Sequence, residues 1–302
     1  MQHPVVLFCY NRPDHLRETL AALAANKGAA DTPLVVFSDG PAHPGEKERV
    51  ARVRALLTAV EGFLSVEVHA SETNLGLAQS VIRGVGQVLE RYPCCIVLED
   101  DLRTAPYFID FMNKGLNRYW KDERIFSISG YCPPIDLPED FGAEAFLFAR
   151  INSWGWATWQ DRWKLVDWDL KEAPSFLQRK SQRSKLAAVG KDLPVMLLRQ
   201  LQGKLSSWAI RFNQACFMLA KTNVYPSRSL VANLGADGSG THMKNSARFR
   251  TTLSEGPLEP YPALEHPKIN AGFERFYRPS WHRRLRSALK LQVYLFKNRP
   301  NS

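Results

Sequence analysis

The sequence lacks any long apolar run, because nowhere in its 302 residues do about 18 apolar residues follow one another. We therefore expect no transmembrane helix. The first residues, MQHPVVLFCYNRPDHL, also lack the basic region and the apolar stretch of a secretory signal. Cysteine is scarce, and the five residues of this type show no metal-ligand spacing: Cys9, Cys94, Cys95, Cys132 and Cys216. We expect free thiols, a reducing compartment and a cytoplasmic protein.

Acidic residues are absent from the end of the chain. Residues 275–302 contain eight Lys or Arg and no Asp or Glu, which leaves only +2 of the net charge of +10 for the rest. A nucleic-acid-binding domain usually spreads its basic surface over the fold. A basic tail on a near-neutral body instead predicts contact with an anionic surface from one side and no nucleic-acid partner.

Repeats and low-complexity segments are also absent, and 45% of the residues are hydrophobic, so a packed core is expected. Short apolar runs alternate with helical patterns in the first third of the chain. The runs predict strands at 4–11, 33–40, 64–71 and 94–100. This alternation is typical of an α/β fold with a mostly parallel sheet covered by helices on both faces.

Polar residues follow each predicted strand. Asn11, Asp39, Asn74 and the acidic triplet 99–101 all stand where a strand is expected to end. Ligands of parallel sheets bind beyond the carboxyl ends of the strands. The triplet Glu99-Asp100-Asp101 follows the apolar run CCIVL, and such a cluster can hold Mg²⁺ or Mn²⁺ that also contacts a phosphate. The alternative is a solvated turn in which Asp101 caps the following segment.

Four motifs occur in order along residues 4–245. They are NLGLAQSVIRG followed by VLEDDL, SWGWATWQDRW, SSWAIRFNQACF and YPSRSLVANLGADGSGTH. Together they resemble a GT-A-fold glycosyltransferase, in particular the bacterial family-2-like group similar to N-acetylglucosaminyltransferase I. The acidic triplet is similar to the DxD-type motif of that superfamily. The resemblance implies transfer of a sugar from a nucleotide-diphosphate donor, with UDP as the expected nucleotide.

The resemblance also implies roles for single residues. Asp101 would ligate the divalent cation, while Glu99 and Asp100 would meet the ribose and the sugar of the donor. The residues that would surround the nucleotide are Tyr10, Asn11 and Arg12 along the pocket, Asp39 at the uracil edge, and Asn74 and Gly76 where the backbone passes close. The alternatives are local: Asp39-Gly40 and 74–76 can be plain turns, and Arg12 can be a solvated loop residue.

The second half of the chain is rich in tryptophan. Residues 151–170 contain five of the eight tryptophans, and aromatic rings pack on the apolar faces of sugars. The resemblance places Trp156 beside the donor sugar; the alternative is a tryptophan of the core. His242 follows a glycine-rich loop and would complete the metal shell or touch the diphosphate, with Asp237 as a weaker candidate. The alternative for His242 is a surface residue.

One position departs from the pattern. The related enzymes carry a carboxylate before the tryptophan of the SWAIRF segment, where it acts as the general base, whereas this chain has Ser206-Ser207. Serine alone does not accept a proton from a sugar hydroxyl near neutral pH. The candidate bases are therefore other carboxylates, namely Asp161, Asp167, Asp169 and Asp237. Arg211 would serve the leaving diphosphate or form a structural ion pair.

These patterns predict three regions: a nucleotide-sugar-binding half at 1–105, an acceptor-binding half of the same domain at 106–272, and a basic amphipathic tail at 273–302. The acceptor would be a glycan or a lipid-linked glycan in bacterial surface polysaccharide, lipopolysaccharide or glycoprotein assembly. In a helix from Ser280 to Lys297, an apolar stripe would lie next to a basic flank, which suits the inner face of the cytoplasmic membrane. The alternative is a helix docked on the body.

Two other functions stay open at this point. The serine pair suits a catalytically impaired protein that keeps the fold and binds a nucleotide sugar or a membrane surface. A nucleotidyltransferase also uses a parallel sheet and acidic metal ligands, but the segment CYNRPDH lacks the glycine-rich, basic loop of those enzymes.

Overall fold

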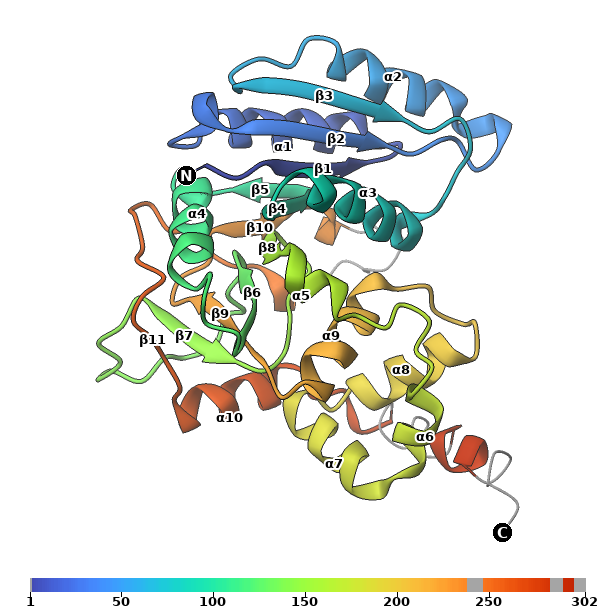
Figure 1. The fold of residues 1–302 in the computed structure, drawn as a ribbon, viewed down its shortest axis with the longest axis vertical. Coiled ribbons are helices and arrows are strands. Elements are labelled where there is room, and N and C mark those ends of the chain that lie inside the picture. The colour runs from blue at the N-terminus through green and yellow to red at the C-terminus, as the bar shows by residue number, and fades with distance from the viewer. Residues whose placement is uncertain (1, 238–246, 283–289, 296–302) are drawn as a thin grey trace.

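The computed structural model describes residues 2–237, 247–282 and 290–295. Its centre is a nine-stranded sheet in the order β11-β7-β9-β6-β8-β4-β1-β2-β3 (Figure 1). The strands of this sheet are β1 (Val5–Cys9), β2 (Pro33–Ser38), β3 (Ser65–Ala70), β4 (Cys94–Glu99), β6 (Ile125–Ser129), β7 (Ala145–Phe148), β8 (Trp156–Trp159), β9 (Thr222–Pro226) and β11 (Ala263–Leu264). A second, two-stranded sheet pairs β5 (Leu102–Thr104) with β10 (Val231–Asn233).

The sheet is mostly parallel. Strands β3, β2, β1 and β4 run in one direction, and β8 enters antiparallel between β4 and β6. Strands β6 and β9 pair in parallel, whereas β7 is antiparallel to β9. This sheet confirms the α/β fold class expected of a GT-A protein, and the predicted strands at 4–11, 33–40, 64–71 and 94–100 are all present.

Helices cover both faces of the sheet (Figure 1). The helices are α1 (Pro13–Ala24), α2 (Lys47–Leu57), α3 (Leu77–Arg91), α4 (Phe108–Arg118), α5 (Gln160–Lys164), α6 (Ala173–Gln178), α7 (Lys180–Val189), α8 (Leu193–Leu201), α9 (Trp208–Met218) and α10 (Pro267–Phe276). The described residues also include the 3₁₀ turns η1 (Ala29–Asp31), η2 (Pro44–Glu46), η3 (Leu234–Asp237) and η4 (Ala247–Phe249).

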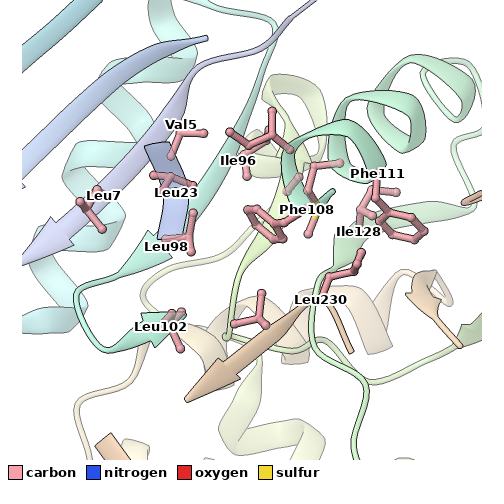
Figure 2. Packing of buried hydrophobic residues seen from close by; sticks show 14 of the residues in the cluster. Val5, Leu7, Leu23, Ile96, Leu98, Leu102, Phe108, Phe111, Ile128 and Leu230 are labelled. Atoms are coloured by element: carbon pink, nitrogen blue, oxygen red, sulfur yellow. The ribbon is translucent and has the colours of Figure 1, made fainter. Parts of the chain in front are cut away.

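The core has two layers because each central strand is buried on both faces. Val5 and Leu7 of β1 point to the layer under α1, α2 and α4 (Figure 2). Val6 and Phe8 point to the opposite layer, under α3 and α9. Helix α3 approaches this layer closely at Gly84, where an added Cβ would lie 2.7 Å from the Phe8 ring. Strands of this type are apolar at every position, which is why they were predictable as continuous runs.

Two smaller clusters complete the core: one joins β7 and β9 to α10 around Phe146, Tyr225 and Phe273, and the other lies outside the sheet. Helices α6, α7 and α8 enclose the latter around Leu177 and Leu197. Leu291 and Tyr294 of the tail pack against this cluster, whereas Trp281 and Val293 are 62% and 48% exposed. Part of the tail therefore contacts the body through Leu291 and Tyr294, whereas Trp281, Gln292 and Val293, which the predicted helix places on its apolar side, face solvent. No helix among the described residues is long and apolar enough to cross a membrane.

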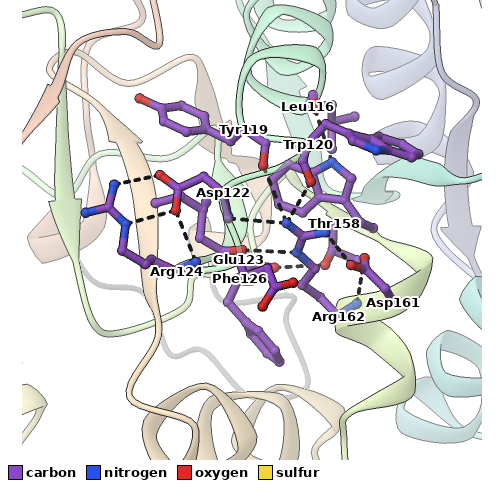
Figure 3. A network of polar contacts seen from close by, with 12 residues as sticks. Leu116, Tyr119, Trp120, Asp122, Glu123, Arg124, Phe126, Thr158, Asp161 and Arg162 are labelled. Atoms are coloured by element: carbon purple, nitrogen blue, oxygen red, sulfur yellow. Dashed lines mark hydrogen bonds and ion pairs between the residues drawn. The ribbon is translucent and has the colours of Figure 1, made fainter.

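Arg162 of α5 is only 3% exposed, and its guanidinium connects neighbouring segments of the chain. Its Nη2 donates hydrogen bonds to the carbonyls of Trp120 at 2.9 Å and Asp122 at 3.2 Å, and its Nη1 pairs with Asp161 at 2.5 Å (Figure 3). The guanidinium also lies 4.7 Å from the centre of the Trp159 ring. The side chain therefore joins α5 to the connection between α4 and β6.

We predict that Arg162→Met lowers the free energy of unfolding by about 3 kcal/mol, because buried carbonyls lose their donors. Chemical denaturation measures the change. The matched control is Arg124→Met, which removes an exposed arginine paired with the same loop and should cost less than about 0.5 kcal/mol. Equal, small losses in both variants would show that the buried network contributes little.

Candidate functional site

The acidic triplet lies at the carboxyl end of β4, as expected, but its three side chains diverge. Asp100 Oδ2 accepts a hydrogen bond from Tyr10 N at 2.9 Å, and Asp101 Oδ2 pairs with Arg12 Nη1 at 3.0 Å. Glu99 interacts with the Trp208 side chain on the other face of the sheet. Within the described ranges, no group of three His, Cys, Asp or Glu side chains could hold a metal. The triplet therefore offers a single facing carboxylate, Asp101, and not a ready three-ligand cage.

The triplet is largely buried, and burial disfavours the ionised forms of its three carboxylates. Burial, followed by repulsion from Asp101, raises the pKa of Glu99 to about 8 and that of Asp100 to about 7. Burial also raises the pKa of Asp101, against the opposing effect of the Arg12 guanidinium. Raised pKa values mean that the ionised carboxylates are unfavourable here. An additional cation would lower these pKa values and favour the charged forms.

A glycine passes close to Asp101. The carbonyl of Asp101 accepts a hydrogen bond from Leu234 N at 2.7 Å. A Cβ added at the next residue, Gly235, would lie 2.4 Å from Asp101 Oδ2 and 3.3 Å from Arg12 Nη1. The buried Oδ1 of nearby Asn233 has no hydrogen-bond partner within the described part of the chain. The backbone of Gly235 thus packs directly against the Asp101 carboxylate, where a larger residue would clash, and this Oδ1 of Asn233 lies next to it.

Glu46 is a site residue that the sequence did not reveal. Its carboxylate accepts hydrogen bonds from the hydroxyl of Tyr10 and from Asn11 Nδ2, the latter at 2.8 Å. The Tyr10 hydroxyl in turn accepts from Ala42 N at 2.9 Å. Hydrogen bonding, chiefly from Tyr10, lowers the pKa of Glu46. Glu46 therefore connects the loop after β1 to the segment after β2.

Asp39 organises the loop after β3. Its Oδ1 accepts hydrogen bonds from Gly40 N and Leu75 N, and its Oδ2 accepts one from Gly76 N, all at 2.9 Å. Asn74 Nδ2 donates to the carbonyl of Gly40 at 2.8 Å. Gly76 has a φ of 75°, which suits glycine. The structure thus brings Asp39, Asn74 and Gly76 together, and the turn alternative describes their local geometry well.

Other predicted residues lie elsewhere. Trp156 is 1% exposed and stacks on Trp208 with ring centres 4.7 Å apart, so the structure favours the core alternative and offers no surface for a sugar. Asp161 lies beyond the start of β4, since Gln160 N bonds to the carbonyl of Pro93. The six residues of β4 separate it from the triplet by about 20 Å. This placement removes Asp161 from the candidate bases.

The remaining candidates divide between described and undescribed positions. Arg211 lies on α9 one turn after Trp208, and its buried Nε has no hydrogen-bond partner within the described ranges. Asp167 and Asp169 are exposed, and Asp167 caps a turn by accepting from Lys171 N at 2.6 Å. Two further predictions fall outside what the structure describes, the side chain of Asp237 and the whole of His242.

The serine pair has a structural role. Ser207 is the N-cap of α9, and its hydroxyl accepts a hydrogen bond from Ile210 N at 3.3 Å. A serine at this position satisfies one of the free backbone donors of the first turn. Ser206 is exposed. Within the described ranges, neither serine forms a hydrogen bond to a carboxylate that would make it a base.

Comparison with known proteins gives distant likenesses. No protein-family model matches the sequence, and no curated protein matches it. Among solved structures, the chain is similar to residues 1–349 of S. aureus TarS at 11% identity and a TM-score of 0.44, over 78% of this chain and 62% of that one. The chain spans 36% of the longer TarS structure.

Two further likenesses bear the names of glycosyltransferases. One is the mannosyltransferase PcManGT of Pyrobaculum calidifontis in complex with GDP-Man and Mn²⁺, at 11% identity and a TM-score of 0.37, over 73% of this chain and 70% of that one. The other is apo mouse xyloside xylosyltransferase 1, at 13% identity and a TM-score of 0.35, over 75% of this chain and 98% of that one.

We predict that Asp39→Ala lowers the free energy of unfolding by about 3 kcal/mol, because three backbone N–H groups lose their acceptor. Chemical denaturation gives the value, and faster proteolysis within residues 72–77 would locate the change. Asp14→Ala, which removes an exposed carboxylate of α1, should cost less than about 0.5 kcal/mol. If Asp39→Ala were as stable as this control, Asp39 would not anchor the loop.

Proposed function

We propose that the protein is a metal-dependent glycosyltransferase that moves a sugar from a nucleotide-diphosphate donor, with UDP as the expected nucleotide, to a glycan hydroxyl. The observation that carries the proposal is the buried, charge-rich triplet at the end of β4. It lies at the sheet edge where Tyr10, Asn11 and the Asp39 loop also gather. Buried acids with raised pKa values favour a cationic ligand at this edge.

The residues beside Asp101 fit a divalent cation. Mg²⁺ and Mn²⁺ sites of this kind use one or two protein carboxylates and complete their shell with substrate phosphates and water. Asp101 is one such carboxylate, and the Oδ1 of Asn233 near it, which has no hydrogen-bond partner among the described residues, is a second oxygen that could serve as a ligand. His242 is proposed as a further ligand from the resemblance alone. When bound, the ion would neutralise negative charge on the leaving diphosphate.

The chain's own residues would bind and orient the donor. Tyr10 and Asn11, held by Glu46, would form a wall of the nucleotide pocket. Asp39 Oδ2 accepts one backbone hydrogen bond and keeps capacity for the ring N–H of uracil. Arg12 pairs with Asp101 and would place positive charge near the diphosphate. Glu99 and Asp100 are proposed near the ribose and sugar, although Asp100 also holds Tyr10 N.

The proposed reaction is inverting, as the resemblance implies. The acceptor hydroxyl oxygen forms a bond to the anomeric carbon, the bond from that carbon to the phosphate oxygen breaks, and the nucleoside diphosphate leaves with the electron pair. The hydroxyl proton goes to a base. Asp237 stays a candidate for this base, and Arg211 is proposed to face the leaving group. We propose a bacterial glycan or lipid-linked glycan as acceptor.

A second candidate is a nucleotide-sugar-binding protein without turnover. Ser207 acts as a helix cap where the resemblance places a base, and Asp161 lies at the far end of β4. Such a protein would bind UDP and metal but would not release product. Scoring transfer and hydrolysis separately on a panel of donors with Mn²⁺ distinguishes the two candidates.

The decisive test of the site is calorimetric titration of UDP with and without Mn²⁺. We predict that Asp101→Asn weakens the binding of UDP in Mn²⁺ at least about tenfold, while stability changes by no more than about 1 kcal/mol. Asp31→Asn, an exposed residue before β2, is the control and should bind normally. Metal-dependent binding that survives in Asp101→Asn would exclude this metal site, and equal affinity for UDP and CDP in the wild type would exclude a uracil pocket.

We also propose that the tail binds an anionic membrane surface, supported by its eight basic residues and by the exposed Trp281 and Val293. Near such a surface each basic residue contributes about 1 kcal/mol. The full chain should therefore sediment with vesicles that contain phosphatidylglycerol at low salt, and a chain ending at Tyr277 should not. A full chain that ignores these vesicles, or a shortened chain that binds equally, would leave the tail a docked structural helix.

A further inference from the structure

A cavity of about 160 Å³ lies between the segment 150–154 and helices α8 and α9. It is lined by segments that come together only in the folded chain: Tyr131 shortly after β6, the segment before β8, helices α8 and α9, η4 and the residue after α10. Strand β8 is antiparallel to β4, and its first residue, Trp156, pairs with Val97. Trp154 of the cavity lining precedes Trp156 by two residues, and Glu99 follows Val97 by two residues. The cavity is therefore at the same sheet edge as the triplet.

Aromatic rings form much of the wall. Trp154 packs edge to face against Tyr131 at 4.6 Å and against Phe249 at 5.5 Å between ring centres. Tyr277 completes the aromatic lining. Rings in this number around a small cavity suit a ligand with apolar C–H faces. Unlike Trp156, Trp154 is only partly buried, so it retains surface for contact.

The cavity is electrically neutral in its described lining. Arg150 is the one residue with a full charge in that set, and both of its terminal nitrogens bond to Asp192, at 2.8 and 2.9 Å. The guanidinium also stacks 3.8 Å from the centre of the Tyr277 ring. With its charge matched and its donors engaged, Arg150 acts as part of the wall. A ligand without a net charge is therefore favoured.

One polar group in the lining has unused capacity. Asn213 is 2% exposed, and its Oδ1 accepts a hydrogen bond from Ile151 N at 3.1 Å. This bond fixes the orientation of the amide, and Nδ2 then has no partner in the described part of the chain. A buried amide donor without an acceptor is unfavourable. A hydroxyl oxygen of a ligand could accept from it after a small adjustment of the side chain.

The wall is also held in place before any ligand arrives. Tyr225 hydroxyl donates to the carbonyl of Arg150 at 2.7 Å, and Asn152 Oδ1 accepts from Trp154 N at 2.8 Å. Cavities that are formed in advance bind small ligands without a large ordering cost.

We propose that this cavity binds one neutral sugar ring, with Trp154 against its C–H face and Asn213 donating to a hydroxyl. The proposal rests on the proposed function and specifies a sugar subsite within it. A sugar ring has the required chemistry, since it combines apolar C–H faces with hydroxyl acceptors and carries no charge. The volume, about five times the roughly 30 Å³ share of one liquid water molecule, suits a single ring. The ring could belong to the acceptor or to the donor.

The test uses the full chain and needs no knowledge of the natural substrate. Methyl glycosides of neutral hexoses and N-acetylhexosamines are titrated without nucleotide or metal, and binding is followed by saturation-transfer NMR. Methyl glucuronide is the charged comparison. Trp154→Ala should weaken binding about tenfold. Ala209→Leu, which fills the cavity from α9 while leaving its polar groups in place, should do the same, and the exposed Trp120→Ala is the control.

Each outcome decides the proposal. Binding of neutral glycosides that both cavity variants weaken, and Trp120→Ala does not, supports a site for the acceptor sugar. If free glycosides do not bind, but UDP-sugars bind more tightly than UDP in the wild type and both variants abolish this gain, the site takes the donor sugar. The proposal is overturned if neither occurs, if glucuronide binds as well as the neutral sugars, or if the variants behave as the control. Because the first arm omits nucleotide and metal, its result is independent of the UDP titration that tests the function.

Discussion

The hydrogen bond from Tyr10 N to the carboxylate of Asp100 joins the ends of the two central strands of the sheet. Asp100 also accepts a hydrogen bond through its backbone carbonyl, from the hydroxyl of Thr19 on α1 at 2.8 Å. Asp100 therefore sets the positions of β1, β4 and the first helix relative to one another. The positions of Tyr10, Asn11 and Arg12 at this sheet edge depend on the alignment, because these residues follow β1 directly.

The alignment also determines what the neighbouring acids can do. Successive residues at the end of a strand point in different directions, so with Asp100 directed at the backbone of β1, Glu99 faces Trp208 and Asp101 faces Arg12. The burial of three acids is tolerated because each has a different partner. Asp101 also lies against the backbone of Gly235, which approaches its carboxylate more closely than a residue with a side chain could.

The sequence predicted the first four strands of the sheet and the gathering of polar residues at their ends because buried parallel strands appear as unbroken apolar runs. It did not reveal β8, which is short, aromatic and reversed between β4 and β6. Nor did the sequence show which tryptophan of the segment 151–170 is buried. Trp154 and Trp156 differ in exposure because the chain turns at Gly155, and the composition of the segment does not reveal this turn. Glu46 was missed because its partners come from another loop, and such contacts leave no periodic signal.

The position of β9 has a consequence for how the chain reaches its final form. This strand lies between β6 and β7 although it follows both in sequence. Strands β1 to β4 can pair as soon as residue 99 has been made, whereas the other side of the sheet waits for Thr222–Pro226. At 5–20 residues per second that interval is roughly 6–25 s of synthesis. Once β7 is complete at residue 148, β6 and β7 lack the partner that lies between them until Pro226 is made. Newly made chains therefore present unpaired strand edges for seconds and would be exposed to capture by chaperones or by one another.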